Sequence, residues 1–248
     1  MTPQAMAAPP PVPQPKSEVA RLAGVFFSPK DTFPDIVARP RWWIPVILFS
    51  LVSLVFVNLF SQRVGWEKTI RAQMERSPQM EQATPEQRER SIQIGTKVAG
   101  YIGYAAPFGS VVTVLLVAAV FMFLFNNMLG ANFRFSSMMG IVAYSFLPTI
   151  ISGALSILVM YMKDPDDFDI QRPLMFNLGA FMPDGTPKWI VAAGYSFDLF
   201  SFWMILLMAI GIHAGARKIA TSKAFITILS PWFVIVLLRV MQSVISGS

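Results

Sequence analysis

The sequence contains no cysteine, and histidine occurs only once, as His213. The absence of cysteine excludes disulfides, thiolate metal sites and cysteine nucleophiles, and a lone histidine excludes a multi-histidine metal site within one chain. Charged residues make up only 14% of the 248 residues, whereas a soluble domain carries about 25%. Hydrophobic residues make up 54%, and the mean hydropathy is +0.53. Together these values indicate an integral membrane protein.

Catalytic signatures are also missing. The motifs H-E-x-x-H and G-x-S-x-G do not occur, so we expect no enzyme, no cofactor and no metal site. The net charge of +6 is attributed to loops that face anionic lipid. We therefore expect the lipid bilayer to be a partner of the chain, and we expect no binding of nucleic acid.

Long stretches with few or no charges predict an all-α fold, a polytopic membrane helix bundle with five transmembrane helices. A bilayer core about 30 Å thick needs about 20 apolar residues in a helix. Within a membrane domain at 42–246, the spans are predicted at about 42–61, 105–127, 136–162, 189–215 and 224–246.

Two polar loops separate these spans. In the loop at 62–97, Thr84 begins a capping-box pattern for a short helix. After this loop, the glycines and the proline between Gly100 and Gly109 predict a bend into the second span. In the loop at 163–188, the apolar stretch 174–182 is too short to cross, so we expect it to lie at the interface or to tuck back against the bundle.

The first 41 residues divide into two parts. Residues 1–15 contain six prolines and predict a disordered tail, whereas 16–41 predict an N-terminal interfacial amphipathic segment. An ordinary solvated linker is the alternative for 16–41. In the interfacial interpretation, aromatic and aliphatic side chains enter the membrane surface and basic side chains face the headgroups; the apolar set is Phe26, Phe27, Phe33 and Ile36, and the basic set is Lys16, Arg21, Lys30, Arg39 and Arg41.

The third span carries a stripe of small and polar residues. Tyr144, Pro148, Ser152 and Ser156 recur at every fourth position, and Ser145 lies beside them. Small and polar residues in a transmembrane helix mark the side on which other helices pack. We therefore predict that Tyr144, Ser145, Pro148 and Ser152 face neighbouring helices, and that Pro148 bends the span. The same residues would also suit the polar path of a transporter.

Two charges lie inside the predicted spans, Asp198 in the fourth and Arg239 in the fifth. The fourth and fifth spans form an antiparallel hairpin that turns near residue 219, so the two charges lie at nearly equal depth. An unpaired charge within a membrane costs about 2.5–3.5 kcal/mol on insertion scales. We therefore predict an ion pair between them, direct or through Ser201 or Gln242; separate snorkelling to the interface is the alternative.

Orientation follows from the distribution of charge. With a cytoplasmic N-terminus, the segments on the cytoplasmic side carry a net charge of +6 and the two polar loops on the other side carry none. We therefore expect a multi-pass protein of a bacterial cytoplasmic membrane with its N-terminus in the cytoplasm.

Three sequence motifs resemble one known family. They are L-A-G-V-F-F-S-P-K-D-T-F-P-D-I at 22–36, A-Y-S-F-L-P at 143–148, and D-L-F-S-F-W at 198–203 followed by A-I-G at 209–211. Over about 22–245 the chain resembles the Yip-one (Ypt-interacting protein) domain family of five-span membrane proteins, and it is most similar to the bacterial branch. The resemblance implies the fold and the membrane. The D-L-Y-G-P motif of eukaryotic relatives, which contact Rab GTPases, has no counterpart here.

Function is consequently predicted at the level of class. We expect a membrane scaffold or interaction protein acting in membrane organisation or trafficking, with membrane proteins or a second copy of itself as partners. A small transporter or lipid-handling protein is the alternative. An intramembrane enzyme is the least favoured class, because the catalytic signatures named above are missing.

Overall fold

The computed structural model describes residues 15–75, 83–183 and 185–246. The proline-rich tail predicted at 1–15 lies outside these residues except for its last proline. Every regular element in the described part is a helix, and extended pairing is confined there to one isolated bridge between Asn177 and Asp198. The predicted all-α class is therefore confirmed.

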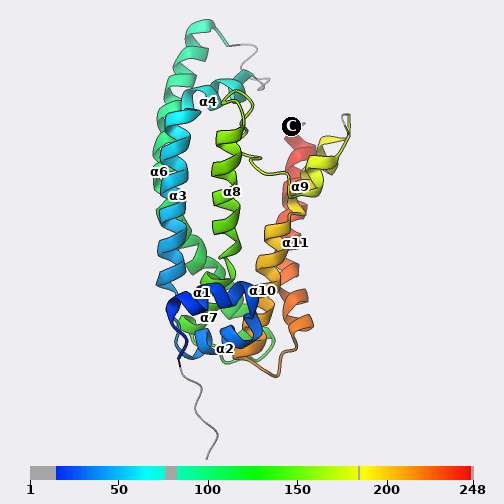
Figure 1. The fold of residues 1–248 in the computed structure, drawn as a ribbon. Coiled ribbons are helices and arrows are strands. Elements are labelled where there is room, and N and C mark those ends of the chain that lie inside the picture. Colours follow the sequence, from blue (N-terminus) through cyan, green and yellow to red (C-terminus); the bar gives the residue numbers. More distant parts are fainter. Residues whose placement is uncertain (1–14, 76–82, 184, 247–248) are drawn as a thin grey trace, which may run out of the picture.

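The helices form an elongated bundle with short elements at both ends (Figure 1). The helices along its long axis are α3 (Trp43–Arg63), α6 (Pro85–Phe123), α8 (Pro148–Met162), α10 (Leu199–Gly215) and α11 (Thr221–Ser246). At one end lie the hairpin of α1 (Glu18–Phe27) and α2 (Pro29–Ala38) and the buried α7 (Phe135–Ser145). At the other end, α4 (Trp66–Glu75) crosses the bundle.

Within the described ranges, four helical stretches are long and apolar enough to cross a membrane. They are α3, α6 extended by the π-helix η1 (Leu124–Met128), the α7–α8 pair, and α11. Large apolar side chains on their outer surfaces are exposed, as lipid-facing residues would be; examples are Phe108, Leu116 and Leu238. Four of the five predicted spans thus correspond to helices of spanning length.

The fourth predicted span, at 189–215, is not one helix. It is divided into α9 (Lys188–Ser196) and α10, with Phe197 and Asp198 between them. The 17 residues of α10 extend about 26 Å, less than a bilayer core of about 30 Å. The prediction of five continuous spans is therefore not confirmed, and the described residues contain four helices of spanning length and composition.

The helix break is stabilised by the apolar stretch 174–182, which was expected to lie at the interface or to tuck back against the bundle. Its backbone pairs with the break, as the second alternative requires. The Leu178 amide donates to the Phe197 carbonyl (3.2 Å), and the Leu199 amide donates to the Phe176 carbonyl (2.9 Å). A short 3₁₀ helix, η2 (Leu178–Phe181), follows. Backbone groups freed by a broken helix must find partners inside a membrane, and this stretch supplies them.

The predicted bend before the second span is wrong. The capping box at Thr84 is confirmed, but the helix that it begins is not the short one expected. Helix α6 has 39 residues and runs without interruption through Gly103 and Pro107. Gly103 allows close packing, since a Cβ there would lie 2.4 Å from Trp66 Cζ2. The Pro107 carbonyl accepts hydrogen bonds from the Ser110 hydroxyl (2.6 Å) and the Ser50 hydroxyl (3.2 Å). Glycine and proline here serve contacts between helices and leave the helix intact.

The bend predicted in the third span is confirmed. Helix α7 ends at Ser145, and α8 begins with Pro148 as its first residue. Proline suits this position because the first residues of a helix have no intrahelical partner for their N–H groups. The half before the break is almost wholly buried, whereas α8 is buried on one side only, so the two halves occupy different surroundings.

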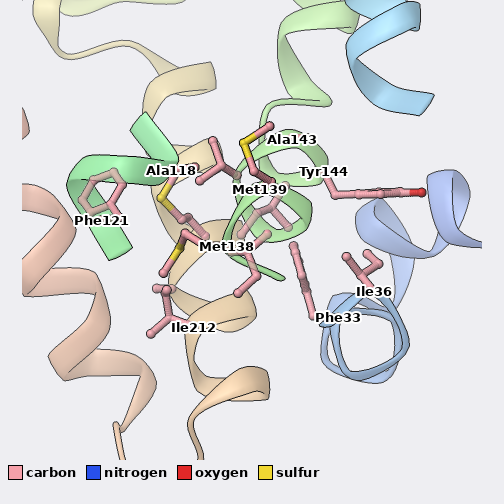
Figure 2. Close-up of a cluster of buried hydrophobic side chains, with 14 of the residues drawn as sticks. Phe33, Ile36, Ala118, Phe121, Met138, Met139, Ala143, Tyr144 and Ile212 are labelled. Carbon is pink, nitrogen blue, oxygen red and sulfur yellow. The ribbon is translucent and has the colours of Figure 1, made fainter. Parts of the chain in front are cut away.

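The main core lies at the hairpin end of the bundle, where α2, α7 and α10 meet (Figure 2). Phe33 and Ile36 have no exposed surface and pack beside α7. Gly211 of α10 makes this contact close, because a Cβ there would lie 2.9 Å from Phe33 Cδ1 and 2.7 Å from Ile141 Cγ2.

The prediction that Phe33 and Ile36 enter the membrane surface is therefore wrong. Both side chains are buried in protein, and only Phe27 of the predicted apolar set, which is 89% exposed, projects freely.

Candidate functional site

Arg21 is the most buried charged side chain in the described residues, with 2% of its surface exposed. Its position follows from local sequence. Ser17 caps α1 by accepting from the Ala20 amide (3.2 Å), which starts the helix so that Glu18, Arg21 and Val25 share one face. That face is turned toward α2 and α7.

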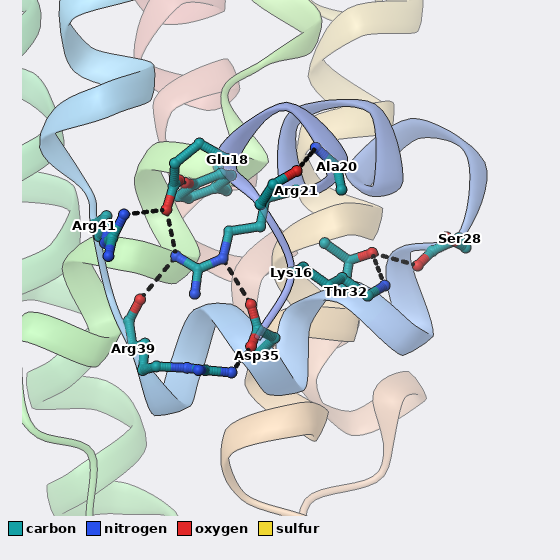
Figure 3. A network of polar contacts seen from close by, with 11 residues as sticks. Lys16, Glu18, Ala20, Arg21, Ser28, Thr32, Asp35, Arg39 and Arg41 are labelled. Carbon is teal, nitrogen blue, oxygen red and sulfur yellow. Dashed lines mark hydrogen bonds and ion pairs between the residues drawn. The ribbon is translucent and has the colours of Figure 1, made fainter. Parts of the chain in front are cut away.

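The Arg21 guanidinium is satisfied by three oxygens of the hairpin (Figure 3). Nε donates to Asp35 Oδ2 (2.6 Å), and one terminal nitrogen donates to Glu18 Oε1 (3.1 Å) and to the Arg39 carbonyl (3.0 Å). Asp35 is also paired with the Arg39 side chain. A buried guanidinium needs such partners, because the cost of removing it from water is otherwise uncompensated.

Tyr144 joins this cluster to the membrane bundle. Its hydroxyl donates to Glu18 Oε2 (2.7 Å), and Arg41 approaches the other oxygen of Glu18 (3.1 Å). A second tie is the Ser137 hydroxyl, which donates to the Val37 carbonyl (3.1 Å). The hairpin is thus fixed to α7 by hydrogen bonds as well as by apolar contact. We call the charged cluster the N-terminal polar network: Glu18, Arg21, Asp35, Arg39, Arg41 and Tyr144.

Opposing effects set the charge states in this network. Burial alone would raise the pKa of Asp35, but its hydrogen bond and attraction to Arg21, supported by Arg39, outweigh burial and lower it below the usual value. Burial alone would lower the pKa of Arg21, but Asp35 and Glu18 outweigh burial and raise it. Both groups are therefore held in their charged forms.

This balance predicts sensitivity of the hairpin to acid. The folded-state pKa of Asp35 lies below its unfolded value of about 3.9, so its stabilising contribution is present above about pH 4 and is lost as the pH falls through the folded pKa. We expect the melting temperature in detergent to fall below pH 4. The Asp35→Asn variant should be less stable at neutral pH and should show a flatter acid limb. Parallel acid limbs for both proteins would contradict the prediction.

The sequence did not reveal this network. Arg21 was predicted to face lipid headgroups, and the structure corrects this, because the carboxylates of Glu18 and Asp35 hold it inside. A usable signal was present: Glu18 lies three residues before Arg21, and Asp35 lies four residues before Arg39. Such spacings place opposite charges side by side on a helix. Here both pairs lie in a segment that also carries many apolar residues, which favours ion pairs between the helices over contact with water.

The predicted stripe of the third span extends from this network to a cavity. Tyr144 and Ser145 have no exposed surface, and the Ser145 hydroxyl donates to the Ile141 carbonyl (2.7 Å). Pro148 begins α8 and is buried. The Ser156 hydroxyl donates to the Ser152 carbonyl (2.8 Å), and Ser152 lines the cavity.

This cavity, which we call the break cavity, has a volume of about 460 Å³ and lies where α8, the 171–177 segment, α9, α10 and α11 approach one another. Its lining is rich in polar side chains, among them Ser152, Gln171, Arg172, Asn177, Tyr195, Asp198 and Arg239. Irregular backbone at membrane depth is tolerated where it lines a cavity, and the break between α9 and α10 does so.

Asp198 and Arg239 both line the break cavity, but no ion pair joins them among the described residues. The Asp198 carboxylate caps α10 instead: Oδ1 accepts from the amides of Phe200 (2.9 Å) and Ser201 (3.2 Å), and Oδ2 accepts from the Ser201 hydroxyl. The helix break creates this use for Asp198, since a new helix N-terminus needs an acceptor. Arg239 is exposed on α11.

Coupling between these two charges stays a prediction, which a charge-swap series tests. We expect Asp198→Lys to destabilise the protein more than Arg239→Glu, because it removes a helix cap and places a cation at a helix N-terminus. The double swap should recover part of the loss if the two charges interact across the break cavity. Thermal melting in detergent measures each step, and strictly additive losses would contradict the interaction.

His213 has a structural contact at the turn between α10 and α11. Its Nδ1–H donates to the Ile219 carbonyl (2.8 Å), which closes that turn. No group of three or more His, Asp or Glu side chains suited to hold a metal ion occurs within the part of the chain that the structure describes.

Comparison with known proteins gives a family match over most of the chain. The family model described as Yip1 domain matches residues 23–241, from the hairpin to the last helix. No curated protein and no solved structure matches the chain.

Proposed function

We propose that this chain, which belongs to the Yip1 domain family and is a multi-pass membrane protein, acts as a membrane scaffold that presents its N-terminal hairpin to partners. The observation that carries the proposal is the docking of α1 and α2 onto the end of the bundle through the N-terminal polar network. A segment fixed in this way is ordered before a partner arrives, and binding to it costs little conformational entropy.

The outer side of the hairpin supports this role. Val19, Ala23 and Phe27 recur at every fourth position of α1 and are exposed, with exposed fractions of 76% for Val19 and 89% for Phe27. An exposed apolar stripe on a rigid helix is a common docking surface for a partner helix, which can be another membrane protein or a second copy of the chain.

Single cysteines test the proposal, since the natural chain has none. We expect Ala23→Cys and Phe27→Cys to give one discrete thiol-crosslinked protein adduct in native membranes. Gln93→Cys, an exposed position on the far end of α6, is the control and should not give it. Crosslinking of the two hairpin cysteines to no protein at all would contradict a scaffold role.

The same variants address orientation and compartment, which we propose to be a bacterial cytoplasmic membrane with the hairpin in the cytoplasm. An impermeant maleimide added to intact spheroplasts should label Gln93→Cys and spare Phe27→Cys. The reverse pattern would place the hairpin outside. Opening the cells should make both cysteines reactive, which controls for burial of either one.

The break cavity favours a second candidate function, the handling of a lipid or a small solute. Its polar lining at a broken helix is typical of binding sites in membrane transporters. Against a transport path, the hydroxyls of Tyr144, Ser145 and Ser156 are each bonded to an acceptor of the protein itself. Substrate-dependent flux into liposomes containing the purified protein would favour this alternative over the scaffold.

A further inference from the structure

The break cavity has an apolar neighbour, which we call the phenylalanine groove. It has a volume of about 370 Å³, and Phe176, Asn177 and Asp198 line both spaces. The other residues of the groove are apolar without exception: Leu178, Phe181, Phe197, Leu199 and Phe202. A polar space and an apolar space that share a wall suit a ligand with a polar head and an apolar tail.

The exposure of the groove indicates a ligand that comes from the bilayer. Phe181 is 74% exposed, Leu178 is 58% exposed and Leu199 is 56% exposed, although all three are large apolar side chains. Arg239 lies 18 residues after Thr221, the first residue of α11, which is about 27 Å along the helix. With Thr221 at one surface of a bilayer core about 30 Å thick, Arg239 lies near the opposite surface. Lipid phosphates lie at that level, and acyl chains lie below it.

The charges beside the groove favour an anion. The break cavity contains the cations Arg172 and Arg239 against the single carboxylate of Asp198, whose oxygens already accept three hydrogen bonds from the start of α10. Arg239 takes part in no ion pair within the described ranges.

The second arginine is oriented by an aromatic ring. The Arg172 guanidinium lies 4.2 Å from the centre of the Tyr195 ring, and one of its terminal nitrogens donates to the Tyr195 hydroxyl (3.4 Å). Its other nitrogens can donate to an anion. Guanidinium groups bind phosphate through paired hydrogen bonds.

We propose that the break cavity and the phenylalanine groove together bind one anionic phospholipid. Its phosphate is held between Arg172 and Arg239, and one acyl chain lies along the groove beside Phe197 and Leu199. The apolar stretch 174–182, which stabilises the helix break, supplies Phe176 and Asn177 to the wall common to both spaces, so the break itself creates the site. This inference is independent of the scaffold role of the hairpin.

Lipid retention tests the proposal. The full chain is purified in mild detergent, delipidated and incubated with phosphatidylglycerol or phosphatidylcholine, and bound lipid is counted by native mass spectrometry. We expect about one phosphatidylglycerol per chain and much less phosphatidylcholine. Arg239→Gln and Arg172→Gln should each weaken phosphatidylglycerol binding about tenfold or more, since each removes a charged hydrogen-bond donor. Arg90→Gln, at an exposed arginine of α6 away from the cavity, should leave binding unchanged.

Further variants and a competitor test the headgroup contacts and the acyl-chain contacts separately. Leu199→Asn should weaken binding by making the groove polar, whereas Leu206→Asn, also exposed on α10 but outside the groove, should not. Glycerol phosphate alone should not compete; competition at equal concentration would identify a soluble phosphate compound as the ligand and overturn the lipid assignment. Equal binding of the two lipids, or equal binding by Arg172→Gln and Arg90→Gln, would also overturn it. Arg172 lies in an exposed loop, so its variant decides the question even if Arg239→Gln fails to fold.

Discussion

Replacement of Arg21 by methionine is expected to lower the free energy of unfolding by about 3 kcal/mol or more. Loss of one partner from a buried ion pair typically costs about 3–5 kcal/mol, because the other charge stays buried without compensation. Here the substitution leaves Asp35 paired with Arg39 alone, and it leaves Glu18 with Arg41 and the Tyr144 hydroxyl. The side chains of these two arginines are 44% and 59% exposed, so neither replaces the buried guanidinium. Reversible unfolding in mixed detergent micelles measures the change.

Arg41→Met is the matched control for this variant. Arg41 approaches the same oxygen of Glu18 at the same distance of 3.1 Å, but its side chain is 59% exposed, against 2% for Arg21. Exposed ion pairs contribute about 0–1 kcal/mol, so the control should lose no more than that. Protease sensitivity of the hairpin should rise in the Arg21 variant alone. Equal losses in the two variants would show that burial does not determine the strength of the network.

Local signals in the sequence predicted local structure well. The capping box at Thr84 and the break at Pro148 each depend on residues within one short segment. Such features follow from hydrogen-bonding capacity and length, which a single sequence displays directly. The family was also recognised from short motifs, and the match over residues 23–241 agrees with it.

The features that sequence analysis missed depend on contacts between distant segments. The break at Phe197 requires backbone partners from residues 176–178. The burial of Arg21 requires Asp35 and Glu18, and Glu18 is in turn held by Tyr144. A hydropathy profile cannot predict the helix break or the buried arginine, because it scores each residue by its type and ignores the residues that it contacts. For the same reason, the sequence does not show that the Asp198 carboxylate caps the start of α10, while its pairing with Arg239 stays a prediction.

Phe33→Ala is expected to destabilise the protein by about 3–5 kcal/mol, the usual cost of removing a buried phenylalanine. The ring is fully buried between α2, α7 and α10, and it packs directly against Gly211, which has no side chain to displace it. The cavity would form among Ile36, Ile141 and their neighbours, at the junction that holds the hairpin to the bundle. Thermal melting in detergent and protease sensitivity of the hairpin should both report the loss.

Phe27→Ala provides the comparison that separates the two interpretations of the N-terminal segment. Phe27 is 89% exposed in the structure, so its replacement should change the free energy of unfolding by less than about 0.5 kcal/mol in detergent. If residues 16–41 instead lay along the membrane surface with both rings in lipid, the two variants would behave alike and neither would alter the packing of α7 against α10. A large loss of unfolding free energy for Phe33→Ala and a small loss for Phe27→Ala therefore require a hairpin that packs on protein. Similar small losses for both variants would instead support an interfacial segment.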